Sequence, residues 1–177
     1  HVLRTEEWLP STPKHILLYE FFNWKAPCWA HLPLLINPDK TKMSKRKGDV
    51  ALDDYIKRGY LPEAMINFLA FLGWNPGMPA SDKATAGKEK EVYSMEELLK
   101  DFSLEKVHKA SAIFNIEKLN WLNGHYIRQL SLEELKEYIV PFLIKHKLLE
   151  KANYGSEYIK KILALEQSRR KNLDEIG

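Results

Sequence analysis

Apolar side chains in the second half of the chain recur three and four residues apart, the spacing of helices that bury one face. Four of these segments open at a residue that favours helix N-caps, namely Ser94, Ser103, Asn115 or Ser131. Pro141 lies inside the last of these segments and is expected to kink its helix. The pattern predicts helices over residues 95–102, 104–109, 116–122, 132 onward and 154–170.

The first half of the chain alternates short apolar runs with proline and glycine. Val2–Arg4 is typical of the middle of a strand, and a second strand is expected over Trp29–Ile36, limited by Pro33. Helical spacing, with proline at the start or glycine at the end, predicts helices over residues 11–24, 52–58 and 62–72. Together these elements predict a mainly α fold with a short β portion.

Residues 75–93 interrupt the helical pattern. Between Asn75 and Lys90 the chain is rich in proline, glycine and charged residues and has no apolar period, which is typical of a surface loop. We expect a mobile insertion here.

The 177 residues suffice for one domain or two small ones, and a hydrophobic content of 45% can form a core. No segment approaches the roughly 18 to 20 unbroken apolar residues of a membrane span, so no membrane association is expected. The one cysteine, Cys28, cannot form an internal disulfide, and the six histidines lack ligand spacing, so no protein-bound metal is expected. Because the chain opens at His1 directly in a strand-like segment, we expect a fragment of a longer protein.

Positive charge is concentrated in one loop. Five of the 27 lysine and arginine residues lie between Lys40 and Lys47, and the other 22 are outnumbered by 24 acidic residues. Such a loop favours a compact anion, for example a polyphosphate, over a long nucleic-acid backbone. Composition alone also allows a solvated charged turn or a nonspecific polyanion site.

The basic loop contains Lys-Met-Ser-Lys-Arg at residues 42–46, which resembles the KMSKS signature of class I aminoacyl-tRNA synthetases. Five other segments resemble the bacterial type of glutamyl-tRNA synthetase, in the family's order. Six ordered matches are far more specific than one lysine-rich motif. The other five segments are residues 1–8, 11–13, 37–41, 59–64 and 118–123.

The resemblance implies three parts. Residues 1–35 would be the C-terminal end of a Rossmann-like catalytic domain, and residues 36–130 a helical stem-contact domain with the KMSKS loop. Residues 131–177 would be the first helices of an α-helical anticodon-binding domain. This sequence lacks the N-terminal half of the family's enzymes, which carries the HIGH signature. The chain alone is therefore expected to be inactive.

The same resemblance implies the activity of a glutamate–tRNA ligase. In that family the glutamate carboxylate attacks the α-phosphate of ATP, pyrophosphate leaves, and the glutamyl group passes to tRNA(Glu). ATP would bring Mg²⁺, bound largely through its phosphates. A monomer in the cytoplasm, or in an organellar matrix, is expected.

Lys42 and Lys45 are the expected catalytic residues, because two ammonium groups on a flexible loop can stabilise charge that develops on the leaving phosphates. The resemblance implies that the loop binds ATP as a unit. Met43, Ser44 and Arg46 are therefore expected ATP-binding residues beside the two lysines.

The resemblance also implies that Arg4 and Trp8 bind glutamate, and a guanidinium can bind a carboxylate through two parallel hydrogen bonds. The alternatives are a surface salt bridge from Arg4 to Glu6 or Glu7, and an ordinary core position for Trp8. On a strand Glu6 and Glu7 would point to opposite faces, so at most one would be functional. The backbone near Leu35 is implied to contact adenine, although Leu35 also fits a buried strand end.

Lys118, Trp121 and Arg128 are expected to contact tRNA, since cations interleaved with aromatic rings suit an RNA backbone. The alternative is that Trp121 belongs to the core and that both cations are solvated surface residues.

Two other functions remain open. A glutaminyl-tRNA synthetase relative shares these motifs but normally continues into β-barrels, which the helical pattern after Ser131 disfavours. A noncatalytic module that binds tRNA through the stem-contact fold would show a steep salt dependence and would ignore ATP.

Overall fold

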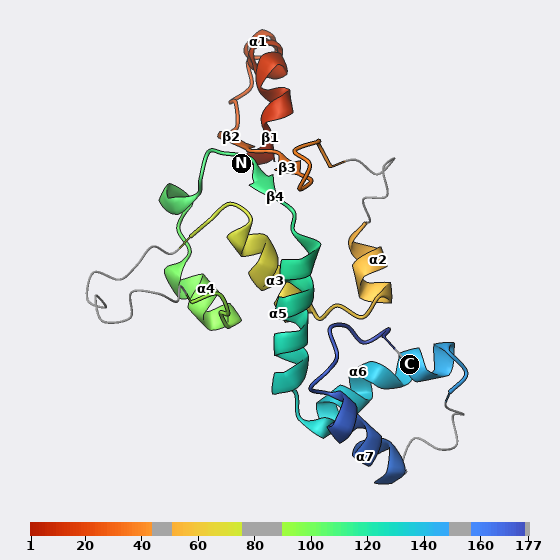
Figure 1. Ribbon diagram of the computed structural model, residues 1–177. Helices are drawn as coiled ribbons and strands as arrows, with labels where there is room; N and C mark the ends of the chain where they lie inside the picture. Colours follow the sequence, from red (N-terminus) through yellow and green to blue (C-terminus); the bar gives the residue numbers. More distant parts are fainter. Residues whose placement is uncertain (44–50, 76–89, 149–156, 176–177) are drawn as a thin grey trace, which may run out of the picture.

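A computed structural model describes residues 1–43, 51–75, 90–148 and 157–175. Figure 1 shows the elements in an extended arrangement, with the N-terminal strands and α1 at one end and α6 and α7 at the other. Helices dominate and the strands are short, which confirms the expected fold class.

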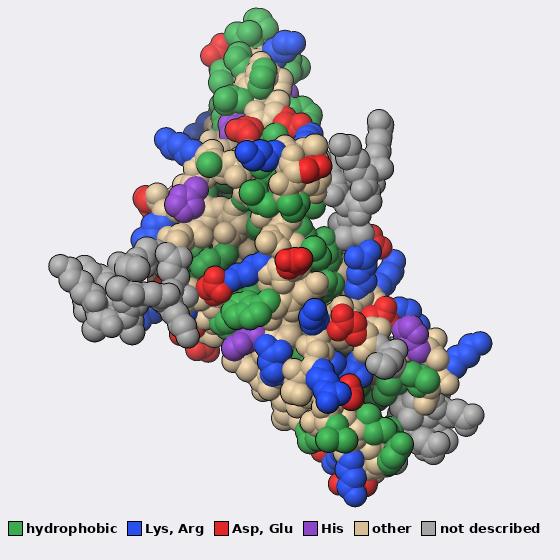
Figure 2. All heavy atoms as spheres, viewed as in Figure 1, with side chains coloured by type: hydrophobic (Ala, Val, Ile, Leu, Met, Phe, Trp, Pro, Cys, Tyr) green, Lys and Arg blue, Asp and Glu red, His purple; other side chains and the backbone are tan. Residues whose placement is uncertain are grey.

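The N-terminal unit is a two-stranded parallel sheet with a helical connection. Strands β1 (Val2–Thr5) and β2 (Trp29–Leu32) pair in parallel, joined by the 3-10 helix η1 (Glu6–Ser11) and helix α1 (Thr12–Phe21). Ser11 precedes α1 but its side chain does not cap the helix, because it already has helical backbone angles as the last residue of η1. Figure 2 shows hydrophobic side chains gathered over this end of the molecule.

The single strand predicted over residues 29–36 is two strands in two sheets. The chain leaves the first sheet at Pro33, which has no N–H to donate to a ladder. Strand β3 (Leu35–Ile36) then pairs in parallel with β4 (Ala112–Ile113), which was not predicted. The expected domain boundary after residue 35 therefore falls inside β3.

Helices α2 (Leu52–Lys57) and α3 (Pro62–Phe71) form as predicted. They meet at Gly59, whose φ of +79° is a backbone conformation that residues with a Cβ rarely adopt. The glycine is required twice over, because a Cβ there would lie 2.5 Å from the Cβ of Leu173. This close approach fixes the C-terminal segment against the turn between α2 and α3.

Helix α4 (Met95–Asp101) confirms the predicted Ser94 cap, whose hydroxyl accepts a hydrogen bond from the Glu97 N–H. The helix predicted over residues 104–109 is only the 3-10 turn η4 (Leu104–Lys106). The chain becomes extended there because Val107 bridges to Trp74.

Helix α5 (Ile116–Gln129) is capped by Asn115, as predicted, but it continues well beyond residue 122. Helix α6 (Leu132–Lys145) starts at the predicted Ser131 cap and includes Pro141. The last helix is α7 (Glu157–Glu166).

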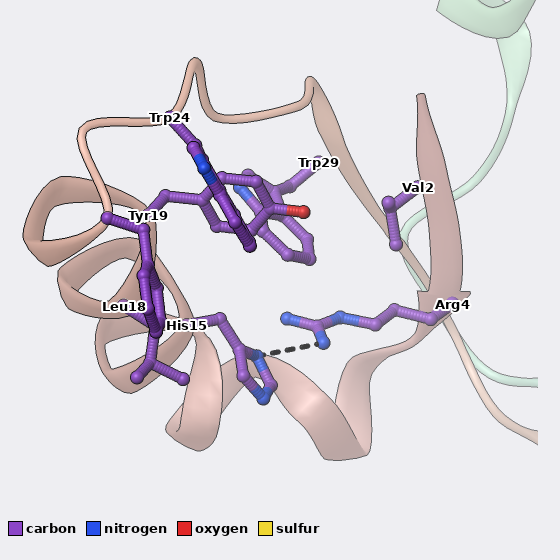
Figure 3. Close-up of a pocket in the computed structure, with 8 residues that line it drawn as sticks. Val2, Arg4, His15, Leu18, Tyr19, Trp24 and Trp29 are labelled. Atoms are coloured by element: carbon purple, nitrogen blue, oxygen red, sulfur yellow. Dashed lines mark hydrogen bonds between the residues drawn. The ribbon is translucent and has the colours of Figure 1, made fainter.

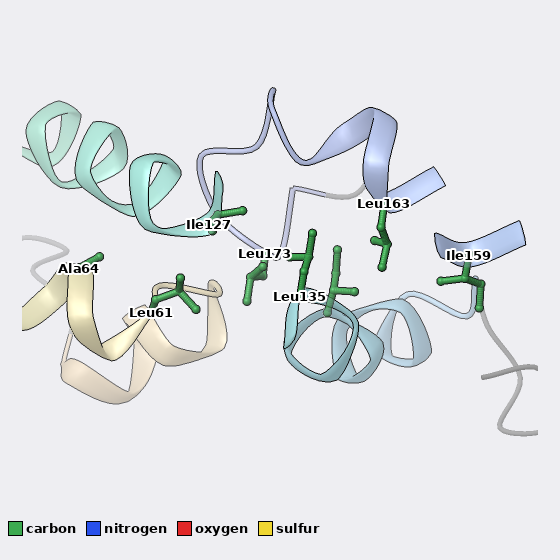
Figure 4. Packing of buried hydrophobic residues seen from close by; sticks show 8 residues of the cluster. Leu61, Ala64, Ile127, Leu135, Ile159, Leu163 and Leu173 are labelled. Carbon is green, nitrogen blue, oxygen red and sulfur yellow. The ribbon is translucent and has the colours of Figure 1, made fainter. Parts of the chain in front are cut away.

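One hydrophobic core joins both sides of the expected boundary after residue 130. Leu61 directly before α3, Ala64 of α3 and Ile127 of α5 belong to the same buried cluster as residues of α6 and α7 (Figure 4). The remaining members of this cluster are Leu135, Ile139, Ile159, Leu163 and Leu173. The first helices of the expected anticodon-binding part are therefore packed directly on the stem-contact part.

Asn123 is a fully buried polar residue that connects three segments. Its Oδ1 accepts from the Leu61 N–H at 2.8 Å, and its Nδ2 donates to the carbonyl oxygens of Gly59 at 3.3 Å and Lys171 at 2.7 Å. Next to it, a Cβ on Gly124 would lie 2.8 Å from the Arg170 carbonyl oxygen. Asn123 and Gly124 thus allow the C-terminal segment to cross α5 at close range.

Most of the expected mobile insertion, residues 76–89, lies outside the described residues. At the end of the expected range, Tyr93 is buried and its N–H donates to Asn67 Oδ1 at 2.6 Å. Tyr93 also packs against Trp74, with ring centroids 6.2 Å apart. The aromatic ring of Tyr93 thus belongs to a core cluster.

Candidate active site

Arg4 lies near the end of β1 and uses three of its donors on neighbouring side chains. Its Nε donates to His31 Nε2 at 3.1 Å, one terminal nitrogen lies 3.1 Å from His15 Nδ1, and the other donates to Thr12 Oγ1 at 2.8 Å. His31 is opposite Arg4 in the parallel register of β1 and β2, while Thr12 and His15 lie on the first turns of α1. Strand pairing and the helical connection therefore create this cluster together.

Aromatic rings flank the guanidinium. The Arg4 Cζ lies 4.5 Å from the ring centroid of Trp29 and 5.6 Å from that of Trp8, distances at which a cation is attracted to a ring face. The His15 ring stacks on Trp29 with centroids 5.9 Å apart and an interplanar angle of 18°. Trp8 is 52% exposed, so the core alternative for this residue is wrong.

The salt bridge considered for Arg4 does not form among the described residues. Glu6 and Glu7 belong to the 3-10 helix η1 and not to a strand, so the expected alternation of their side chains does not apply. The Glu6 carboxylate accepts from the Leu34 N–H at 3.4 Å, and the Glu7 carboxylate accepts from Lys42. Within the described part of the chain, Arg4 therefore has no acidic hydrogen-bond partner.

A cavity of about 370 Å³ lies beside Arg4, between β1 and α1. Figure 3 shows Arg4 extending from β1 towards His15, with Tyr19, Trp24 and Trp29 around the hollow. The other residues that line it are Val2, Leu18 and Phe22. Apart from Arg4 and His15, the walls are therefore mainly apolar and aromatic.

The base of the basic loop is a tight turn that follows β3. Asn37 N–H donates to the Thr41 carbonyl at 2.8 Å, and Thr41 N–H donates to the Asp39 carboxylate at 2.8 Å. Lys40 inside this turn has a φ of +65°. The turn returns the chain antiparallel to β3, so that Lys42 bridges Ile36.

Lys42 joins this loop base to the N-terminal unit through an ion pair with Glu7. The hydrogen bond from the Lys42 ammonium lowers the pKa of the Glu7 carboxyl below its ordinary value. Both side chains are about half exposed, at 54% and 44%. The structure thus brings Lys42 to η1, the 3-10 helix that contains Trp8 and begins two residues after Arg4.

Met43 and Leu35 also meet at the loop base, where the Met43 N–H donates to the Leu35 carbonyl at 3.3 Å. Leu35 is only partly covered, at 36% exposure, so it is not a buried strand end. The other expected ATP-binding residues, Ser44, Lys45 and Arg46, lie outside the described residues.

The residues expected to bind tRNA lie on one face of α5. The Lys118 ammonium lies 4.6 Å from the Trp121 ring centroid and also pairs with Glu91. Trp121 is 45% exposed, so it is not a core residue, and Arg128 is exposed as well. His125 lies on the same face of α5, with its ring centroid 5.9 Å from that of Trp121.

Sequence reasoning missed His15 and His31 as functional candidates, whereas it had considered Glu6 and Glu7 and expected at most one of them to be functional. The partners of Arg4 lie 11 and 27 residues away, and only the strand register and the crossover bring them together. Glu7 carried a weak signal, because it lies three residues after Arg4 in a segment already selected by resemblance.

Among the described residues, no group of three or more histidine, cysteine, aspartate or glutamate side chains is arranged to bind a metal ion. None of the described helices combines the length and apolar character needed to cross a membrane.

A family model described as tRNA synthetases class I (E and Q), catalytic domain, matches residues 1–121, more than half of the chain. The chain therefore belongs to the class I tRNA synthetases of the E and Q type. The curated relatives that it matches are glutamate–tRNA ligases.

The glutamate–tRNA ligase of Chlorobium luteolum is 51% identical over 175 residues, which are 96% of this chain and 33% of the relative. The ligase of Chlorobium phaeobacteroides is 56% identical over 144 residues, covering 81% of this chain and 27% of the relative. This chain thus spans about a third of the length of these relatives.

Solved structures agree with the family. The glutamate–tRNA synthetase of Elizabethkingia anophelis superposes with a TM-score of 0.76 at 37% identity, covering 99% of this chain and 36% of that chain. A glutamate–tRNA ligase from Elizabethkingia meningosepticum, solved in complex with its amino acid, gives a TM-score of 0.74 at 37% identity with the same coverage.

Proposed function

We propose that this chain is the part of a glutamate–tRNA ligase that carries the KMSKS loop, one side of the glutamate site and the stem-contact helices. The complete enzyme would join glutamate to ATP, release pyrophosphate, and transfer the glutamyl group to tRNA(Glu). The observation that carries this proposal is the ion pair between Lys42 and Glu7. This ion pair joins the base of the basic loop to η1, the 3-10 helix near Arg4.

Arg4 is suited to bind a substrate carboxylate. A guanidinium has five N–H donors and no acceptor, and three of the five are used within the chain. The two remaining N–H groups equal the number that a carboxylate accepts in a bidentate pair. With no acidic partner on Arg4 among the described residues, its charge remains available to glutamate.

Lys42 and Lys45 would act on ATP. Two ammonium groups near the β- and γ-phosphates stabilise the charge that develops as pyrophosphate leaves. Mg²⁺ would enter with the nucleotide and remain bound mainly to its phosphates. Met43, Ser44 and Arg46 would contact ATP from the same loop, with the backbone near Leu35 beside the adenine.

The exposed face of α5 would bind tRNA. Lys118, Trp121, His125 and Arg128 recur three and four residues apart along the helix, so they form one stripe of cations and aromatic rings. Stacking and charge in such a stripe suit the backbone and unstacked bases of RNA. The chain could therefore bind tRNA even without the remainder of the catalytic domain.

The loop assignment is tested in the full-length ligase that contains this chain, by ATP–pyrophosphate exchange with Lys45→Ala. We expect a loss of about a hundredfold or more, the effect of removing one preorganised charge from a transition state, with tRNA affinity nearly unchanged. Lys57→Ala is the matched control, since Lys57 is 74% exposed on α2, and it should retain full exchange. Exchange at the normal rate in Lys45→Ala would refute the assignment.

A further inference from the structure

The contacts of Arg4 constrain the protonation of its neighbours. Because a guanidinium only donates, His15 Nδ1 and His31 Nε2 must each present a lone pair to it. Each imidazole is then neutral and carries its proton on the other ring nitrogen. The two histidines are therefore acceptors for Arg4 at two different ring positions, δ on His15 and ε on His31.

Thr12 supplies the third acceptor by a similar argument. Its hydroxyl has one hydrogen, which it donates to the Trp8 carbonyl oxygen at 2.9 Å. The hydroxyl oxygen is then an acceptor for the Arg4 terminal nitrogen at 2.8 Å. It also lies 3.1 Å from His31 Nε2, and its residue is nearly buried, at 9% exposure.

Three acceptors around one planar group define its orientation. Nε and both terminal nitrogens each have a separate partner, so the plane of the guanidinium cannot rotate without breaking at least one bond. The stacking of His15 on Trp29 fixes the imidazole in turn. An arginine ordered before substrate arrives loses less side-chain freedom on binding, which increases affinity.

We propose that His15 and His31 are positioning residues that orient Arg4 for the substrate carboxylate. This inference rests on the proposed function, in which Arg4 binds glutamate. Their contribution falls on glutamate binding and not on the phosphate chemistry, because Lys42 pairs with Glu7 and neither histidine contacts Lys42 among the described residues. The two positions require acceptors at different places, δ at residue 15 and ε at residue 31.

The amide side chains offer a geometric test of this requirement. The oxygen of asparagine occupies nearly the place of a histidine Nδ1, and the oxygen of glutamine nearly that of Nε2. His15→Asn and His31→Gln thus retain an acceptor where Arg4 needs it, whereas the exchanged pair, His15→Gln and His31→Asn, misplaces it. His15→Leu and His31→Leu remove the acceptor altogether.

Glutamate KM, ATP KM and kcat are measured by ATP–pyrophosphate exchange in the full-length ligase. We expect His15→Leu and His31→Leu to raise glutamate KM about tenfold or more, with ATP KM and kcat within about twofold of the wild type. His15→Asn and His31→Gln should restore glutamate KM to within about threefold, and the exchanged pair should not. His108→Leu, at an exposed histidine outside this cluster, should match the wild type.

An unchanged glutamate KM in both leucine variants, or equal rescue by asparagine and glutamine at each position, would overturn the inference. Arg4→Leu, assayed in parallel, separates this failure from that of the proposed function. If Arg4→Leu raises glutamate KM and the histidine variants do not, only the positioning role is wrong. If Arg4→Leu leaves glutamate KM unchanged, the glutamate site itself is misassigned.

Discussion

Asn123→Ala should be among the most destabilising single changes in this chain, because the asparagine bonds to three backbone groups from a fully buried position. Removing its side chain leaves the Leu61 N–H without that acceptor in a residue that is 2% exposed. Such an unsatisfied buried group costs roughly 1–3 kcal/mol. The Gly59 carbonyl still accepts from the Leu173 N–H at 3.1 Å, so its loss is smaller. Together with the lost hydrogen bond to the Lys171 carbonyl, the free energy of unfolding should fall by about 3 kcal/mol.

The matched control is Asn115→Ala on the same helix. Asn115 is exposed and caps α5 by accepting from the Glu117 and Lys118 N–H groups, at 2.9 and 3.1 Å. Loss of an N-cap costs about 1 kcal/mol. Both variants therefore remove an asparagine side chain at α5. The two asparagines differ in burial and in the segments to which they bond.

Urea unfolding of the 177-residue chain, followed by circular dichroism, measures both variants. With a denaturant slope of about 2 kcal/mol/M, the midpoint should fall by about 1.5 M for Asn123→Ala and about 0.5 M for Asn115→Ala. Equal shifts would refute the reasoning, because burial and three backbone bonds would then contribute nothing beyond an exposed cap.

Two further predictions concern charge and RNA. Burial tends to raise the pKa of Asp174, but hydrogen bonds from His146 and Lys145 outweigh it and lower that pKa. A carboxyl with a depressed pKa in the folded state stabilises the protein above its unfolded pKa, and this stability is lost as the pH falls through the folded value. Asp174→Asn should therefore show a shallower loss of melting temperature than the wild type below about pH 4; identical slopes would exclude this ion pair as a source of acid sensitivity. Trp121→Ala should weaken tRNA binding about tenfold in a filter-binding titration, since stacking on an aromatic ring contributes about 1–3 kcal/mol per base. Leu99→Ala, a change of a more exposed apolar residue on α4, should bind normally, and a Trp121→Ala affinity equal to it would remove α5 from the RNA-binding surface.

Local signals in the sequence predicted the elements that local chemistry determines. The caps at Ser94, Asn115 and Ser131 all form, because a side-chain acceptor and a free N–H two or three residues away are sufficient. Gly59 likewise ends its helix where a positive φ is needed. Ser103 failed as a cap because Val107, further along, pairs with the distant Trp74.

Features that depend on distant parts of the chain were not predictable in this way. The extent of α5 was underestimated because Asn123 and Gly124 have poor helix propensity, yet both serve contacts with residues 170–171. The parallel pairing of β3 with β4 joins segments more than seventy residues apart, and two-residue strands leave no periodicity to detect.

The residues of the candidate site also fall into those that the sequence indicates and those that only the fold brings together. Arg4, Trp8 and Lys42 were found by resemblance to a family, and the structure brings them to one region. The histidines that bond to Arg4 carry no sequence signal, since one comes from the opposite strand and the other from the following helix. Side-chain constellations of this kind arise only when the topology is known.

Helix α5 has a mechanical consequence for the whole molecule. Its 14 residues form a rod about 21 Å long, which begins just after β4 and ends just before α6. A rotation of this rod by about 5° would displace its far end by about 2 Å, enough to make or break a hydrogen bond. A displacement of α6 and α7 would therefore reach β4 and, through its pairing with β3, the turn that carries Lys42.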